Sequence, residues 1–183
     1  MPDSRLLKVI YRWRVRAGTI GVLAVLIFAH PAWKPMLAGM ALSLVGLAVR
    51  AWASGHLRKE KTLAISGPYR YSRNPLYFGN MILGIGFALG SWSWIVAAIL
   101  AAYFLVFYPV VIMEERRRMR ALFPAAYGSY EKAVPLFFPA PGKNGMDKKI
   151  PFSPALYRKN KEIRAVLGTI FFWALLVAKR LIM

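Results

Sequence analysis

A long uncharged stretch is the feature of this sequence that most restricts its fold. From Asn74 to Met113 the chain has 40 residues without a Lys, Arg, Asp or Glu. A single helix of that length would be about 60 Å long, roughly twice the hydrocarbon thickness of a bilayer. At the centre of the stretch, residues 90–94 (GSWSW) combine turn-forming Gly and Ser with Trp, which favours the membrane interface. We therefore predict a helical hairpin with two spans, Leu76–Leu89 and Trp92–Met113.

The composition agrees with a membrane protein. Hydrophobic residues make up 58% of the 183 residues, and the mean hydropathy of +0.43 excludes an intrinsically disordered chain. Lys and Arg number 26 against 7 Asp and Glu, which gives a formal net charge of +19. Many basic chains bind nucleic acid, but here the charges lie between apolar blocks, so we expect no nucleic-acid partner. With no Cys, the chain has neither a disulfide scaffold nor thiolate metal ligands.

Three further apolar blocks extend the predicted membrane domain. The first two are Ala17–Trp33 and Met36–Ala53, in which Arg50 lies close enough to the end to reach the interface. The last, Ala165–Ala178, is short, so it is a tilted fifth span, a partial span or an in-plane helix. The basic pair at 179–180 fits poorly with a full crossing and favours the partial or in-plane form. The predicted fold is an all-α, polytopic membrane bundle with four core transmembrane helices, the last two a tight hairpin, and a possible fifth C-terminal helix.

The basic residues indicate how the bundle is oriented. They cluster in the segments 54–73 and 114–164 and in the N-terminal arm, whereas the turns on the opposite side hold only Lys34. The positive-inside bias then makes the arm and both segments cytoplasmic in a multi-pass integral membrane protein. We divide the chain into three regions: a basic cytoplasmic arm (1–16), a membrane core (17–139), and a linker with a C-terminal hydrophobic helix (140–183).

The first cytoplasmic segment ends in a motif at the entrance of the hairpin. Pro75 disfavours helical geometry at Asn74 and fits the first turn of the next helix, so Asn74 is a predicted N-cap. Free backbone N–H groups at that helix start, beside Arg73, suit a carboxylate or a phosphate. The alternative is purely structural, with an interfacial Arg, a cap and neighbouring tyrosines in the aromatic belt. Spacing alone favours this structural alternative.

The second cytoplasmic segment begins with two adjacent acids at the membrane boundary, Glu114 and Glu115. Either they pair with Arg117 and Arg118 along the helix, at about 0.3 kcal/mol each, or one of them points into a cavity and binds a cationic ligand. Charge alone does not distinguish these two interpretations. His56 is the only His outside the first turn, and no second His or Cys lies at ligand spacing, so we expect no bound metal.

Taken together, these motifs resemble those of the membrane methyltransferase superfamily that includes isoprenylcysteine carboxyl methyltransferases and phospholipid N-methyltransferases. The resemblance covers roughly residues 40–139, in the order and spacing typical of that group. The carboxyl methyltransferases often carry His where this chain has Asn74, and the tail 143–183 extends past the usual closing Val-Pro. The matching positions are Gly67-Pro68-Tyr69, Arg73-Asn74-Pro75-x-Tyr77-x-Gly79, Glu114-Glu115, Phe123, Tyr127, Tyr130 and Val134-Pro135.

The resemblance implies an integral membrane enzyme that uses S-adenosylmethionine (AdoMet) at a cytoplasmic site. Its other partners would be membrane lipids and a lipophilic acceptor that enters from the bilayer, such as a phospholipid amine or an isoprenoid-type carboxylate. By the same resemblance, Glu115, Arg73 and Glu60 are the candidate catalytic residues. The residues implied in cofactor binding are His56, Tyr69, Arg73, Asn74, Pro75, Tyr77, Gly79, Glu114 and Glu115.

The chemistry of AdoMet fits several of these side chains. Its carboxylate suits Arg73 or the helix start beside it, and its ammonium or ribose suits Glu114 or Glu115. Tyr77 is suited to stack on the adenine or to face the sulfonium. Methyl transfer mainly requires that nucleophile and methyl lie about 3 Å apart, in line and away from water. An amine acceptor must also lose a proton, for which Glu60, Glu114 and Glu115 are candidate bases.

Two other functions are compatible with the same composition. A membrane reductase with a nicotinamide cofactor would use a similar hairpin, although the close pair Glu114-Glu115 and the ending Val134-Pro135 argue against it. A non-enzymatic adaptor would bind anionic lipid headgroups through its basic loops. The adaptor would not need an Arg-Asn-Pro motif facing an acidic pair.

Overall fold

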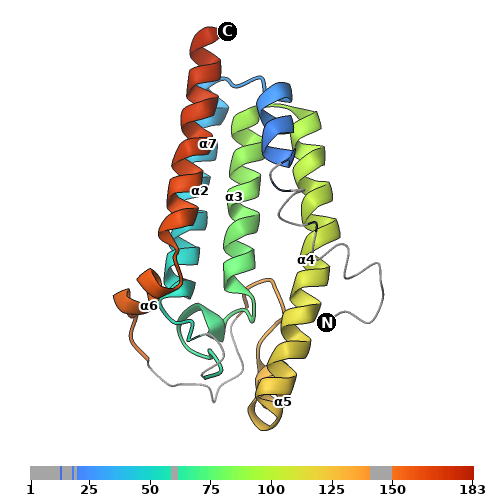
Figure 1. The fold of residues 1–183 in the computed structure, drawn as a ribbon, viewed down its shortest axis with the longest axis vertical. Helices are drawn as coiled ribbons and strands as arrows, with labels where there is room; N and C mark the ends of the chain where they lie inside the picture. Colours follow the sequence, from blue (N-terminus) through green and yellow to red (C-terminus); the bar gives the residue numbers. More distant parts are fainter. Residues whose placement is uncertain (1–12, 14–17, 19, 59–61, 141–149) are drawn as a thin grey trace.

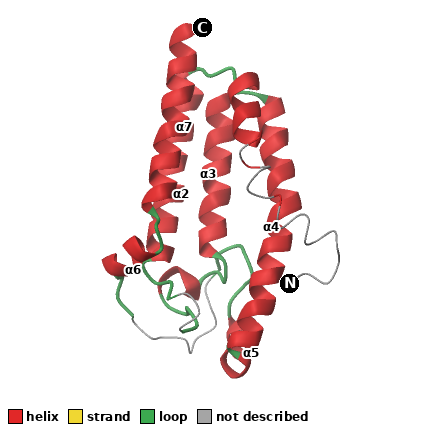
Figure 2. Cartoon of the chain, in the orientation of Figure 1, coloured by secondary structure: helices red, strands yellow, loops and turns green. Residues whose placement is uncertain are grey.

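The computed structural model describes residues 13, 18, 20–58, 62–140 and 150–183, and it is helical without strands in these parts (Figures 1 and 2). This confirms the predicted all-α membrane bundle. Residues 20–28 are helical, and four longer helices run alongside one another, while three short elements lie near one end. The elements are α2 (Trp33–Ser54), η1 (Gly67–Arg70), α3 (Pro75–Ser91), α4 (Trp94–Leu122), α5 (Pro124–Ala133), α6 (Pro154–Lys159) and α7 (Ile163–Ile182).

The apolar helices indicate a membrane protein. In the described part of the chain, α2, α4 and α7 are each long and apolar enough to cross a bilayer. The helix α3 is also apolar but has 17 residues. It leads directly into α4, so the uncharged stretch forms the predicted hairpin (Figure 1).

The turn of the hairpin lies at Trp92 and Ser93, within the predicted segment. Trp92 ends α3 in a left-handed conformation, with φ at 48°. The Ser93 side chain accepts a hydrogen bond from the backbone N–H of Val96 and so caps α4. The helix α4 continues to Leu122, past the predicted end of the apolar span at Met113. The apolar run stops at Met113, but the Glu and Arg residues that follow are good helix formers, so the helix persists beyond it.

Of the three forms predicted for the C-terminal helix, the structure favours the fifth span, because α7 is long and apolar enough to cross a bilayer. The helix α7 runs lengthwise beside α2 (Figure 1), and its side chains Phe172, Trp173 and Leu176 join the main hydrophobic core. The Lys179 Nζ donates hydrogen bonds to the carbonyls of Leu26 and Ile27, at 2.5 and 2.9 Å. These carbonyls end the helix of residues 20–28, so the lysine acts as a C-terminal cap contributed from another helix.

Close packing of α2 on α3 fixes the geometry of the bundle. A Cβ on Gly39 would lie 2.4 Å from the carbonyl oxygen of Gly86, and one on Gly46 would lie 2.9 Å from that of Gly79. Small residues therefore allow the two backbones to touch, as they do in many membrane helix pairs. The Trp173 ring of α7 lies over this seam, 2.8 Å from the Gly39 Cβ position. The contact aligns the ends of α2 and α3, where the candidate site lies.

Candidate functional site

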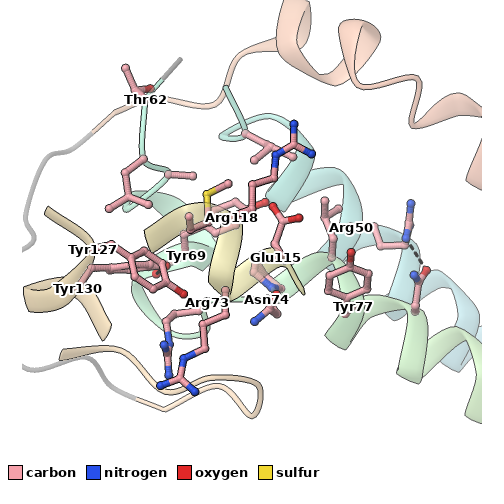
Figure 3. A pocket seen from close by; sticks show the side chains of 18 residues that line it. Arg50, Thr62, Tyr69, Arg73, Asn74, Tyr77, Glu115, Arg118, Tyr127 and Tyr130 are labelled. Carbon is pink, nitrogen blue, oxygen red and sulfur yellow. Dashed lines mark hydrogen bonds between the residues drawn. The ribbon is translucent and has the colours of Figure 1, made fainter. Parts of the chain in front are cut away.

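A cavity of about 520 Å³ lies where α3 begins and the charged part of α4 passes it (Figure 3). It therefore lies at the end of the bundle opposite the hairpin turn. Its walls combine four arginines and one carboxylate with tyrosines and aliphatic side chains. The lining residues are Arg50, Leu57, Thr62, Leu63, Ala64, Tyr69, Arg73, Asn74, Pro75, Leu76, Tyr77, Asn80, Glu115, Arg116, Arg118, Met119, Tyr127 and Tyr130.

Most of the predicted site residues meet in this cavity. The hairpin brings Arg73, at its entrance, to the same cavity as Glu115, near its exit. Tyr77 comes from the first turn of α3, and Tyr69 comes from the short helix η1 before it. In Figure 3, Glu115 lies between Tyr77 at one end of the cavity and the neighbouring Tyr127 and Tyr130 at the other.

Hydrogen bonds to the segment after α5 hold the hairpin entrance in place. The backbone N–H of Arg73 donates to the carbonyl of Pro135 at 3.0 Å, and Ser72 Oγ donates to the carbonyl of Phe137 at 2.7 Å. Asn74 occupies the N-cap position as predicted, but its side chain caps nothing. Its Nδ2 instead donates to the carbonyl of Leu136 at 2.9 Å. The segment that follows Val134 therefore holds the Arg73-Asn74-Pro75 loop in position.

Glu131 on α5 joins the two sides of the site, and the sequence analysis missed it. One carboxylate oxygen accepts from Arg73 Nη1 at 2.7 Å and from Arg116 Nε at 2.5 Å, and the other accepts from Arg120 Nη2 at 2.6 Å. Partial burial alone would raise the pKa of Glu131. The hydrogen bonds from Arg120, Arg73 and Arg116 outweigh that effect and lower the pKa to about 2. Glu131 is thus an anion at all physiological pH values, and it orients Arg73.

Arg73 keeps one donor for a ligand. Its side chain is 9% exposed, and Nη1 is engaged by Glu131. The Nε atom is buried and has no hydrogen-bond partner among the described residues. An unsatisfied buried donor is costly, so a ligand carboxylate that reaches this nitrogen would stabilise the site.

Another part of the cavity wall is aromatic and uncharged. Tyr130 donates its hydroxyl to the carbonyl of Tyr69 at 2.8 Å, and its ring lies 6.0 Å from that of Tyr127 in an edge-on arrangement. Burial, reinforced by the neighbouring Tyr130, raises the pKa of Tyr69 well above its ordinary value. Burial likewise raises the pKa of Tyr130. These neutral rings suit a flat heterocycle or an organic cation.

Four of the predicted residues are not in the cavity wall. Glu60 lies outside the described residues. Glu114 is on α4 beside Glu115 but does not line the cavity, and Gly79 serves the α2–α3 contact. His56 lines a separate, smaller cavity, where Nδ1 is 2.9 Å from the Trp52 carbonyl and Nε2 is 3.1 Å from that of Ile150. It therefore connects the end of α2 to the C-terminal tail.

Arg50 and Asn80 are further cavity residues that the sequence analysis did not assign to a site. Arg50 donates from Nε to Glu162 Oε1 at 2.6 Å and from Nη1 to Asn80 Oδ1. An arginine inside an apolar block is itself a signal of function, because a charge within a membrane segment needs a partner. The sequence analysis had interpreted Arg50 as reaching the interface.

Comparison with known proteins identifies the family of the chain. Residues 36–126 match the phospholipid methyltransferase family, and the chain belongs to the superfamily of membrane methyltransferases that this family shares with isoprenylcysteine carboxyl methyltransferases. The match covers most of α2, the hairpin and the first residues of α5. It therefore includes every described cavity residue except Tyr127 and Tyr130.

Among individual proteins, two relatives are named for metal resistance. The chain is 37% identical over 136 residues to the cobalt-zinc-cadmium resistance protein CzcN of Cupriavidus metallidurans. It is 34% identical over 136 residues to the nickel-cobalt-cadmium resistance protein NccN of Alcaligenes xylosoxydans xylosoxydans. Each match covers 69% of this chain and 62% of the relative, so the chain spans less than two thirds of their length. No solved structure matches the chain significantly.

Proposed function

We propose that this protein transfers a methyl group from AdoMet to a lipophilic acceptor at the cytoplasmic face of the membrane. The observation that carries the proposal is the single cavity lined by Arg73, Tyr77 and Glu115, at the open end of a membrane hairpin. Membership in a superfamily of membrane methyltransferases supports it. Two alternatives are a nicotinamide-dependent reductase and a lipid-binding adaptor.

The cavity has suitable groups for each part of AdoMet. Its volume of about 520 Å³ falls within the roughly 300–1,000 Å³ typical of small-molecule sites. The unpaired Nε of Arg73 is suited to the carboxylate, and Glu115 to the ammonium. The neutral rings of Tyr127 and Tyr130 are suited to the adenine or the sulfonium. When bound, AdoMet would supply an electrophilic methyl group.

The residues of this chain would position the reactants and exclude water. Arg73 is held by Glu131 and by the backbone of the closing segment, so it needs little reorganisation on binding. In the described part of the chain, Glu115 is the one acid that lines the cavity. For an amine acceptor, we infer that Glu115 takes the proton that must leave before transfer. A carboxylate or thiolate acceptor requires no base.

Calorimetric titration of the purified protein tests the proposal. We expect the wild type in neutral detergent to bind AdoMet and not NADPH. Glu115→Gln should lose most of that affinity, whereas Glu114→Gln, its neighbour outside the cavity wall, should bind as the wild type does. Binding of NADPH alone would favour the reductase, and binding of neither would favour the adaptor. Equal effects of the two Gln variants would refute the assignment of the site.

Cysteine labelling tests the orientation. The sequence has no Cys, so a single introduced thiol reports one position. Ser129 is exposed on α5 at the cavity end, and Lys34 is exposed at the opposite end. We expect a membrane-impermeant maleimide to label Lys34→Cys in intact cells and Ser129→Cys only after the membrane is opened. The reverse pattern would contradict the cytoplasmic site.

A further inference from the structure

Arg50 is a charged residue of α2 placed one turn before the helix ends, in an otherwise apolar block. Its side chain is 15% exposed, and the residue lines the cavity. Figure 3 shows Arg50 beside Tyr77 at the end of the cavity away from Tyr127 and Tyr130. A guanidinium in such a position must be paired, because removing a charge from water without compensation is costly.

The partners of Arg50 hold its guanidinium in one orientation. Nε donates to Glu162, whose side chain is 5% exposed, and Nη1 donates to Asn80 of α3. The Asn80 side chain in turn donates a hydrogen bond to the Tyr108 side chain of α4. These contacts engage Nε and Nη1, and no partner for Nη2 is found among the described residues. Arg50 therefore retains donor hydrogens for a ligand.

The C-terminal extension is built so that Glu162 reaches Arg50. Asn160 donates from Nδ2 to the carbonyls of Ser54 and Leu57, at 2.8 and 2.9 Å, and so binds the end of α2. Lys161 then adopts a left-handed conformation, with φ at 57°, which is unfavourable for a residue with a Cβ. This turn begins α7 and directs Glu162 back into the bundle. The acid comes from outside the matched family region, which ends at residue 126.

We propose that Arg50 forms a subsite for an anionic oxygen of the acceptor, and that Glu162 is its positioning residue. The proposal rests on the proposed methyl transfer only for the identity of the ligand. Arg73 supplies a donor for the single carboxylate of AdoMet, so a second guanidinium in the same cavity is available to the other reactant. The Arg50 end of the cavity is formed by the membrane helices, from which a lipophilic acceptor would enter. A carboxylate or phosphate oxygen next to an aliphatic chain fits that position.

Binding of three amphiphiles with the same chain tests the subsite without requiring turnover. We would titrate oleate, oleyl phosphate and oleyl alcohol into the full-length protein in neutral detergent. We expect the wild type to bind the two anions roughly tenfold or more tightly than the alcohol. Arg50→Gln/Glu162→Gln should abolish that preference while leaving the affinity for AdoMet within about twofold. The double variant is used because Arg50→Gln alone would leave Glu162 buried and unpaired.

Glu162 is tested separately as a positioning residue. Glu162→Gln should weaken oleate binding several-fold without changing oleyl alcohol binding, and Glu162→Asp should restore part of the loss. Arg164→Gln, an exposed cation on the same helix, is the matched control and should bind as the wild type does. Retention of the anion preference in the double variant overturns the proposal, as does a parallel loss of AdoMet affinity. Failure of the wild type to bind AdoMet would instead refute the proposed function, so the two failures are distinguishable.

Discussion

The packing of α2 on α3 leads to a quantitative prediction at Gly39. An Ala at this position would place its Cβ 2.4 Å from the carbonyl oxygen of Gly86 and 3.0 Å from the backbone nitrogen of Gly90. Both contacts are with backbone atoms, so a side-chain rotation cannot relieve them and the helices must separate. Overpacking of this kind costs about 1–3 kcal/mol.

Gly168→Ala is the matched control for this substitution. Gly168 lies in α7, where a Cβ would meet nothing within 4 Å. Both substitutions gain roughly 1 kcal/mol of helix propensity, so that gain cancels in the comparison. The difference between the two variants is then the steric term alone. For a chain of this size, about 2–4 °C per kcal/mol converts it to a difference in Tm of roughly 2–12 °C.

Thermal unfolding in one detergent, followed by near-ultraviolet circular dichroism, measures this difference. We expect Gly168→Ala to be at least as stable as the wild type and Gly39→Ala to unfold at a lower temperature than Gly168→Ala. If Gly39→Ala is as stable as Gly168→Ala, the helices are not in backbone contact at this point. The alignment of the ends of α2 and α3 at the cavity would then be wrong as well.

Three more variants test other contacts by the same unfolding assay. Glu131→Gln should lower the free energy of unfolding by roughly 1.5–3 kcal/mol. The pKa of Glu131 in the folded protein, about 2, lies below the ordinary 4.5. The wild type should therefore lose this stability as the pH falls from 4.5 towards 2, and the variant should show no such loss. Lys179→Met should cost about 1–2 kcal/mol by uncapping the first helix, whereas Lys159→Met, at an exposed position, should cost nothing measurable. Trp173→Ala should cost roughly 3–5 kcal/mol, and a cost below 1 kcal/mol would contradict the place of α7 in the core.

The hairpin was predictable because it follows from one physical limit. An uncharged stretch twice as long as the bilayer is thick has to turn, and the sequence marks the turn with small residues and Trp. The end of α4 was not predictable in the same way, since hydropathy reports where the membrane ends and not where the helix ends. The positions of Arg73 and Glu115 in one cavity followed from the hairpin.

Contacts between distant parts of the chain account for what was missed. Arg50 meets Glu162 across 112 positions, and Arg73 meets Glu131 across 58. A single sequence contains no information on which charges pair over such distances. The contact of Lys179 with the end of another helix was missed for a related reason, because nothing in the local sequence of a lysine shows which distant carbonyls it reaches.

His56 shows where a resemblance and the cavity differ. The resemblance alone grouped His56 with the cofactor residues, on the polar segment before the Gly-Pro-Tyr motif. In the structure α2 ends at Ser54, and the His56 ring packs against Gly67 and Phe152, outside the main cavity. A match in sequence order therefore did not show on which side of the helix end the His56 ring would lie.

Transfer of an isotopically labelled methyl group tests the central claim most directly. Membranes containing the wild type or Glu115→Gln would be incubated with methyl-labelled AdoMet, and the extracted lipids analysed by mass spectrometry. We predict a labelled lipid with the wild type and with Glu114→Gln, and none with Glu115→Gln. Labelled lipid at the same level with Glu115→Gln, or none with the wild type across a full lipid extract, would contradict the account.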